Sequence, residues 1–283
     1  MRQEQPNYLN VAQHEHLPAN NGQLHILLDG ALVEAARFAY THDDNPAVQK
    51  LYAGTRHNNA IEVSPCLIQP SAASRLWDVE DQWRDFGIVL QSDTEPEVLA
   101  DHLRSLISIR LPSRQLAYCR FYSPKWVGQL LESCTEDELK AFSGPIQRWF
   151  TYEHTAWLSL APTITGQSRS ASDEGWFCLR QQQLDLFQAA EEQRYVERMA
   201  SHFGCPSVTT TEGTAARDQL GQLILKARQY GFKQEHQCTH YLELAWRFPE
   251  ELKTPELGSL MADQSLATDT RLEQAEKRLF GLV

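Results

Sequence analysis

The densest group of metal-ligand side chains in this sequence is His236, Cys238 and His240, three ligands within five residues. Histidine and cysteine are side chains that commonly bind zinc in proteins. The surrounding residues predict a helix, in which successive side chains turn by about 100°. The two histidines then share one face, whereas Cys238 points about 200° away, onto an apolar stripe. We therefore expect solvent-facing histidines and a core cysteine here, and no metal site.

Motifs of the common hydrolases and nucleotide-binding enzymes are absent from the sequence. It contains no G-x-S-x-G nucleophile elbow, no G-x-x-x-x-G-K-[ST] phosphate loop and no G-x-G-x-x-G dinucleotide fingerprint. His42 and Asp43 could supply a base and the group that orients it, with Ser64 as nucleophile. Histidine and aspartate that follow a helix more commonly cap a loop. We therefore predict a protein that is not an enzyme and binds no cofactor.

Two charged residues stand at positions where a fold places functional groups. Asp29 follows the apolar run at residues 24–28, and active sites of α/β folds gather at the carboxyl ends of strands. The same side chain could instead cap the turn at Gly30. Arg120 is a planar cation between Tyr118 and Tyr122, suited to a carboxylate or a peptide backbone, or to an ordinary ion pair with a neighbouring acidic residue. Both alternatives stay open for each residue.

Arg120, Tyr122 and Trp126 also follow one another at the end of a predicted strand and the start of a predicted helix. Binding surfaces concentrate their energy in a few aromatic and arginine anchors. We therefore predict a partner-binding surface made of Asp29, Arg120, Tyr122 and Trp126. The alternative for Trp126 is that it belongs to the buried face of its short helix.

The elements that must position these residues alternate between strands and helices over the first 160 residues. Apolar runs and alternation predict strands at 24–28, 61–69, 86–90, 147–152 and 155–160, and a hairpin at 107–111 and 116–122. Helical spacing predicts helices at 33–40, 72–85, 97–106, 124–131 and 135–142. Pro65 would place the second strand at an edge or at a bulge. We expect an α/β fold with flanking helices, whose sheet has mixed strand directions because of the hairpin.

Residues 162–175 are polar and rich in turn formers, without periodicity, and predict a linker. Amphipathic stripes follow at about 186–203, 220–230 and 238–248, and a fourth helix is expected at about 270–282. We therefore predict an α/β domain at 1–161, the linker at 162–175 and an all-α lobe at 176–283.

Composition and charge limit the partners. The 283 residues include 37 acidic and 26 basic side chains, a net charge of −11. Residues 1–165 carry 13 basic and 20 acidic side chains and residues 166–283 carry 13 and 17, so neither half favours nucleic acid or an anionic membrane. No apolar stretch is long enough for a signal peptide or a membrane span, and the six cysteines form no C-x-x-C pair. We expect a cytoplasmic protein with reduced thiols.

Seven segments, in order, resemble the N-terminal domain of the type VI secretion effector adaptors, also called effector chaperones. The resemblance covers roughly residues 24–155. The segments are Leu28-Asp29-Gly30-Ala31, Leu51-Tyr52-Ala53-Gly54-Thr55, Val63-Ser64-Pro65-Cys66-Leu67-Ile68, Phe86-Gly87-Ile88-Val89-Leu90-Gln91-Ser92, His102-Leu103-Arg104, Arg120-Phe121-Tyr122-Ser123-Pro124 and Phe142-Ser143-Gly144-Pro145-Ile146. The helical half, with Lys226-Ala227-Arg228-Gln229-Tyr230-Gly231-Phe232, looks like the C-terminal lobe of the same proteins. The hairpin turn at 112–115 departs from that pattern because it lacks a glycine.

The resemblance implies a bacterial, cytoplasmic, non-catalytic protein that holds a toxic effector and hands it to the valine-glycine-repeat spike protein (VgrG). We expect the effector to lie in a groove between the two lobes, where a helix or an extended segment can be buried. One alternative is a small-molecule enzyme that uses Asp29 and Arg120 at the edge of the sheet. Another is a structural subunit of the secretion apparatus.

Overall fold

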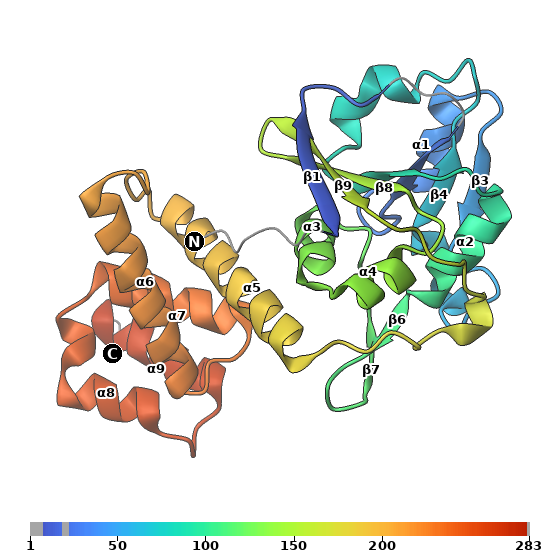
Figure 1. The fold of residues 1–283 in the computed structure, drawn as a ribbon. Helices are drawn as coiled ribbons and strands as arrows, with labels where there is room; N and C mark the ends of the chain where they lie inside the picture. Colours follow the sequence, from blue (N-terminus) through green and yellow to red (C-terminus); the bar gives the residue numbers. More distant parts are fainter. Residues whose placement is uncertain (1–7, 19–22, 282–283) are drawn as a thin grey trace. The chain divides into compact units, whose positions relative to one another are not determined.

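The computed structural model describes residues 8–18 and 23–281. The chain divides into two compact units, Met1–Phe187 and Gln188–Val283, which we call unit 1 and unit 2 (Figure 1). Unit 1 is an α/β fold and the chain from residue 181 onward is helical, as the sequence predicts. The division lies C-terminal to the predicted linker at 162–175, because residues after that segment, among them Phe177 and Leu179, are buried in the core of unit 1.

The sheet of unit 1 contains seven described strands. Its order is β1 (Leu9–His14), β9 (Ala156–Pro162), β8 (Arg148–Glu153), β5 (Gly87–Gln91), β2 (Leu24–Leu28), β4 (Cys66–Gln69) and β3 (Ala47–Lys50). The pairings between these strands are antiparallel throughout, so the expectation of mixed strand directions was wrong. The hairpin is present, but β6 (Ser108–Arg110) and β7 (Leu116–Tyr118) form a separate two-stranded sheet and leave the directions of the main sheet unaffected.

Alternation along the central strands divides the interior of unit 1 into two cores, because successive side chains point to opposite faces of a sheet. In β2, Leu27 belongs to the core that contains the buried faces of α2 (Pro96–Ser105), α3 (Pro124–Ser133) and α4 (Glu136–Ser143). Ile26 and Leu28 face the other core, which contains residues of α1 (Ala35–His42) and of the 3-10 helix η2 (Leu76–Gln82) (Figure 1). Helices therefore cover both faces of the sheet.

Local sequence explains where most of these elements begin. Pro96 and Pro124 each stand in the first turn of their helix, where no backbone donor is needed. Thr135 and Glu138 form a reciprocal capping box at the start of α4. We expected Pro65 to mark an edge strand or a bulge, and this expectation was wrong. Pro65 precedes β4, which pairs on both sides, so its missing N–H is not needed in the ladder.

Unit 2 is built from amphipathic helices. They are the part of α5 (Gln181–His202) beyond residue 187, α6 (Thr211–Gln229), α7 (Glu235–Arg247), α8 (Pro255–Ala262) and α9 (Thr268–Leu279). Leu220, Ile224, Leu242 and Leu272 are buried in one cluster at the centre of the unit. Within residues 8–18 and 23–281, no helix has both the length and the apolar character that a membrane crossing requires.

Candidate functional site

Asp29 and Arg120, which are distant in sequence, form an ion pair in unit 1. Asp29 ends β2 and is only 2% exposed, and Arg120, which follows β7, donates to its Oδ2 with a side chain that is 44% exposed. The Ala31 N–H donates to Asp29 Oδ1 over 3.0 Å, so this carboxylate also caps the turn at Gly30. The hydrogen bond to Asp29 raises the pKa of Arg120. Both structural alternatives weighed for Asp29 and Arg120, the cap and the ion pair, are therefore realised.

Gly30 allows this turn to approach the backbone of Val63 and Ser64 closely, because glycine has no Cβ. A Cβ at position 30 would overlap the backbone carbonyl of Ser64 and approach the carbonyl carbon of Val63 to 2.9 Å. Neither atom can swing aside as a side chain would. Ser64 is itself engaged, since its Oγ accepts from the Tyr52 N–H over 3.0 Å and donates to the Pro65 carbonyl. These bonds leave no free serine nucleophile at this position.

Three tyrosine hydroxyls meet beside the ion pair. Tyr118 forms hydrogen bonds to the hydroxyls of both Tyr52 and Tyr122. Burial raises the pKa of Tyr118 and of Tyr122, so both hydroxyls stay protonated at neutral pH. Tyr122 is 1% exposed, whereas Tyr118 is 40% exposed. Tyr122 is therefore placed to support Tyr118, and the predicted direct contact of Tyr122 with a partner has no exposed surface to use.

A second polar group adjoins the tyrosines. His57 Nε2 lies 3.1 Å from both Ser108 Oγ and Glu174 Oε1, and Ser108 donates to the same carboxylate oxygen. Arg56 Nε donates to the other oxygen of Glu174 over 3.1 Å. Serine, histidine and glutamate are the residues of a hydrolase triad, but there the acid holds the second ring nitrogen. Here serine and glutamate share one nitrogen, which is the geometry of a structural network.

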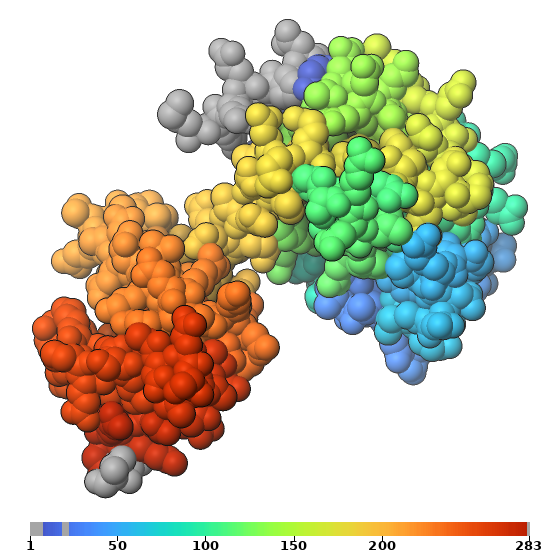
Figure 2. All heavy atoms as spheres, turned by 90° about the horizontal axis from the view of Figure 1, so that it is seen from below, coloured from blue at the N-terminus to red at the C-terminus, as the bar shows by residue number. Residues whose placement is uncertain are grey.

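We call these residues together the hairpin corner. They are Asp29, Tyr52, Arg56, His57, Ser108, Tyr118, Arg120, Tyr122 and Glu174. Figure 2 shows the segments that contribute them, the blue loop near residue 55, the green hairpin and the yellow segment near residue 174, side by side on one face of unit 1. Sequence reasoning found Asp29, Arg120 and Tyr122. It missed His57 and Glu174, which stand 117 positions apart and have no local pattern that would connect them.

Trp126 lies apart from the ion pair. It is half-buried on α3, and its ring packs edge-on against Phe187 with centroids 5.2 Å apart. The fully buried face of α3 is formed by Val127, Leu130 and Leu131 instead. The structure therefore does not make Trp126 a core anchor of its helix, and its partner-binding role stays a prediction.

The segment predicted as a linker is attached to unit 1. His102 is fully buried, accepts from the Arg169 N–H at Nδ1 over 3.1 Å and lies 2.9 Å from the Phe142 carbonyl at Nε2. This arrangement requires the tautomer with its proton on Nε2. Burial lowers the pKa of His102, which keeps the ring neutral. The Ala171 N–H donates to Asp101 Oδ2 over 3.3 Å, and just after the segment Trp176 donates to Ser105 Oγ over 3.1 Å, so the segment packs along α2.

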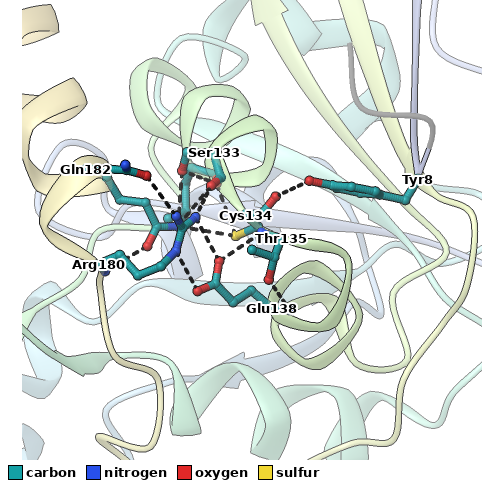
Figure 3. Close-up of polar contacts among 9 residues, drawn as sticks. Tyr8, Ser133, Cys134, Thr135, Glu138, Arg180 and Gln182 are labelled. Carbon is teal, nitrogen blue, oxygen red and sulfur yellow. Dashed lines mark hydrogen bonds and ion pairs between the residues drawn. The ribbon is translucent and has the colours of Figure 1, made fainter. Parts of the chain in front are cut away.

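The beginning of α5 is attached by a further polar group, drawn in Figure 3. Arg180 donates to both carboxylate oxygens of Glu138, over 2.9 and 3.1 Å, and to the Ser133 carbonyl over 2.6 Å. Tyr8 donates to the Cys134 carbonyl from the other side, over 2.8 Å. Burial raises the pKa of the Cys134 thiol to about 12, so this cysteine stays protonated and unreactive. The contacts connect the end of α3, the start of α4 and the first turn of α5.

The remaining sequence candidates have structural partners. Asp43 accepts from the N–H groups of Asn45 and Ser71, over 3.0 and 2.7 Å, as a loop cap does. Cys238 is 4% exposed within the core of unit 2. His240 lies 3.3 Å from Glu276, and His236 lies 3.7 Å from Asp269. Within the described ranges no group of three histidine, cysteine or acidic side chains is arranged to hold a metal ion.

Part of unit 1 matches a family model. Residues 24–141 match the family model described as "Domain of unknown function (DUF4123)". The match lies entirely in unit 1, inside the region of residues 24–155 that carries the seven segments described above. No curated protein and no solved structure matches the chain.

The segments that resemble the adaptors contact one another in unit 1. The first segment meets the third at Gly30 and Ser64, and the sixth through the ion pair of Asp29 with Arg120. The fifth meets the seventh, because His102 lies against the Phe142 carbonyl and occupies the space that a Cβ at Gly144 would need. These residues therefore form the internal contacts of unit 1, and most of them are not exposed to a partner.

Proposed function

We propose that the protein is a non-catalytic adaptor that binds a type VI secretion effector and delivers it to the VgrG spike. The observation that carries the proposal is that six of the seven ordered adaptor-like segments lie inside the DUF4123 match at residues 24–141. The contacts among those segments agree with it, because they join the segments into one scaffold.

The pairing of the carboxylates in the hairpin corner favours the adaptor over the small-molecule enzyme. An enzyme site converges polar groups on a pocket, with some of them available to substrate. In the hairpin corner, Asp29 is bound by Arg120, and Glu174 is bound by Arg56 and Ser108. The buried carboxylates are thus already neutralised by partners within unit 1.

Deletion of the gene in a bacterium with an active type VI system tests the proposal. An adaptor is required for one cargo, so secretion of a single effector should stop while the tube protein is still secreted. Purified full-length protein should then bind that effector and VgrG. Loss of all secretion would instead identify a structural subunit of the apparatus, and unchanged secretion of every effector would contradict the adaptor function.

A further inference from the structure

Unit 2 contains an open groove with an apolar floor. Its volume is about 470 Å³, and its floor includes Leu223, Tyr241, Ala245 and Leu252. Pro249, one of the lining residues, follows α7 at a position where a proline does not allow the helix to continue. The chain then turns through the short helix η4 (Glu251–Lys253), whose Leu252 packs back into the core.

The rim of the groove is polar, and the charged side chains that line it are lysines. Lys226 and Lys253 stand on it, together with glutamines of α6. The lining residues, all within the described part of the chain, include no aspartate or glutamate. Lys253 does contact Glu250 over 2.7 Å, but both side chains are more than 60% exposed, and such a pair contributes little. Leu225 adds an exposed apolar side chain, 49% exposed, at the same rim.

The backbone around the groove determines the form of the occupant. The walls are helices, whose backbone groups are already hydrogen-bonded within each helix, so no strand edge is available to an extended peptide. A helix satisfies its own backbone and needs no such edge, so it suits these walls. The lining residues of α6 extend from Gln219 to Gln229, which is about 15 Å at 1.5 Å per residue. That length fits roughly three turns of a helix.

We propose that this groove binds an amphipathic helix of the effector that carries acidic side chains beside its apolar stripe. The apolar stripe covers Leu223, Leu225 and Leu252, and the acidic side chains pair with Lys226 and Lys253. The inference rests on the proposed adaptor function, and it names the surface and the chemistry by which the effector is recognised.

The first test uses the full chain and two labelled helical peptides of about 16 residues. Both have the same leucine stripe, flanked by glutamates in one peptide and by lysines in the other. Fluorescence anisotropy should show saturable binding of the glutamate peptide, with a Kd at least about tenfold lower than that of the lysine peptide. Equal affinity for the two peptides, or binding of neither, would overturn the proposal.

Variants locate the binding in the groove. Leu225→Glu and Lys226→Glu should each weaken binding of the glutamate peptide by about tenfold or more. Val208→Glu and Lys233→Glu are matched controls, because both residues are exposed in unit 2 and neither lines the groove. They should leave the affinity unchanged. If all four variants bind like the wild type, the groove is not the site.

The effector complex separates this inference from the proposed function. If the wild-type protein binds no effector, the adaptor function fails. If the effector binds the wild type and Leu225→Glu equally well, the adaptor function stands and the groove inference fails. A second copy of this chain is the other possible occupant of the groove, and light scattering tests for it. If the wild type is a dimer and Leu225→Glu is a monomer, a second copy occupies the groove and the proposal is overturned. If Leu225→Glu does not fold, the double variant with Lys226→Glu and Lys253→Glu, both at the rim of the groove, decides between these outcomes.

Discussion

The hairpin corner of unit 1 and the groove of unit 2 both present cationic side chains, but the cations differ in what they face. In the corner, Arg120 and Arg56 each contact a carboxylate whose side chain is at most 8% exposed. In the groove, Lys226 and Lys253 stand beside apolar surface, and among the described residues no acidic side chain lines it. A cation that faces a buried acid stabilises the fold, whereas one beside open apolar surface can bind a partner. Residue type alone does not distinguish the two cases.

The largest loss of stability is expected for a core substitution beside the groove. Ile224→Ala, at a fully buried position of α6, should lower the free energy of unfolding of unit 2 by about 2–5 kcal/mol, through lost burial and a residual cavity. Urea denaturation followed by far-UV circular dichroism measures this, because unit 2 is helical. A loss below about 1 kcal/mol would mean that α6 is not packed as described.

Gly30→Ala should be the most damaging small change in the corner. The added methyl group meets backbone atoms of Val63 and Ser64, so the two segments must separate, at a cost of about 1–3 kcal/mol. Gly54→Ala is a useful comparison, because nothing lies within 4 Å of its Cβ position and only its φ of 73° opposes alanine. Tryptophan fluorescence during denaturation reports mainly on unit 1, which contains six of the seven tryptophans. Equal stability of Gly30→Ala and the wild type would contradict the close approach.

Arg120→Ala tests directly whether the corner is structural. The substitution leaves the buried Asp29 carboxylate without its cation, and we expect a loss of about 1–2 kcal/mol in the free energy of unfolding. Effector binding, measured at a temperature where the variant is folded, should change less than it does in Lys226→Glu. If Arg120→Ala has the same free energy of unfolding as the wild type but no longer binds the effector, the contrast between corner and groove is wrong.

Acid should weaken unit 1 through its buried histidines. Burial lowers the pKa of His25 and of His102, so below the unfolded-state pKa of about 6.5 the unfolded chain binds protons that the fold does not. This contribution to stability is complete above pH 6.5 and is lost as the pH falls below it, by at most about 1.4 kcal/mol per pH unit for each histidine. Denaturation midpoints between pH 7 and 5 measure the slope. His102→Gln should reduce the slope, whereas the exposed His236→Gln should not, and identical slopes for all three proteins would refute the assignment.

The smallest effect is expected at the groove itself. Lys226→Ala removes a half-buried side chain at the rim of the groove and should change the free energy of unfolding by less than about 0.5 kcal/mol. Thermal melts check this beside the binding assay. A large loss of stability would show that Lys226 supports the fold of unit 2 and would remove the contrast with the corner.

Much of the fold is predictable because its signals are local. Apolar runs predict β2 and β5, helical spacing predicts α2 and the stripes of unit 2, and Pro96 marks the start of α2. The strands that the sequence analysis missed, β1 and β3, are the two edges of the sheet. An edge strand is paired on one side and needs less apolar surface, so its sequence carries a weaker signal. The pairing β1 with β9 joins residues that no local pattern relates.

The candidate site divides in the same way. The sequence by itself determined that Asp29 ends a buried strand, that Arg120 stands among tyrosines, and that Cys238 faces away from the two histidines beside it, because each statement follows from the period of one strand or helix. Only the tertiary structure decided that Asp29 and Arg120 pair with each other, that Glu174 reaches His57, and that Pro249 lines a groove beside α6. These contacts join segments far apart in the chain, and they depend on how whole elements pack rather than on any period within one of them.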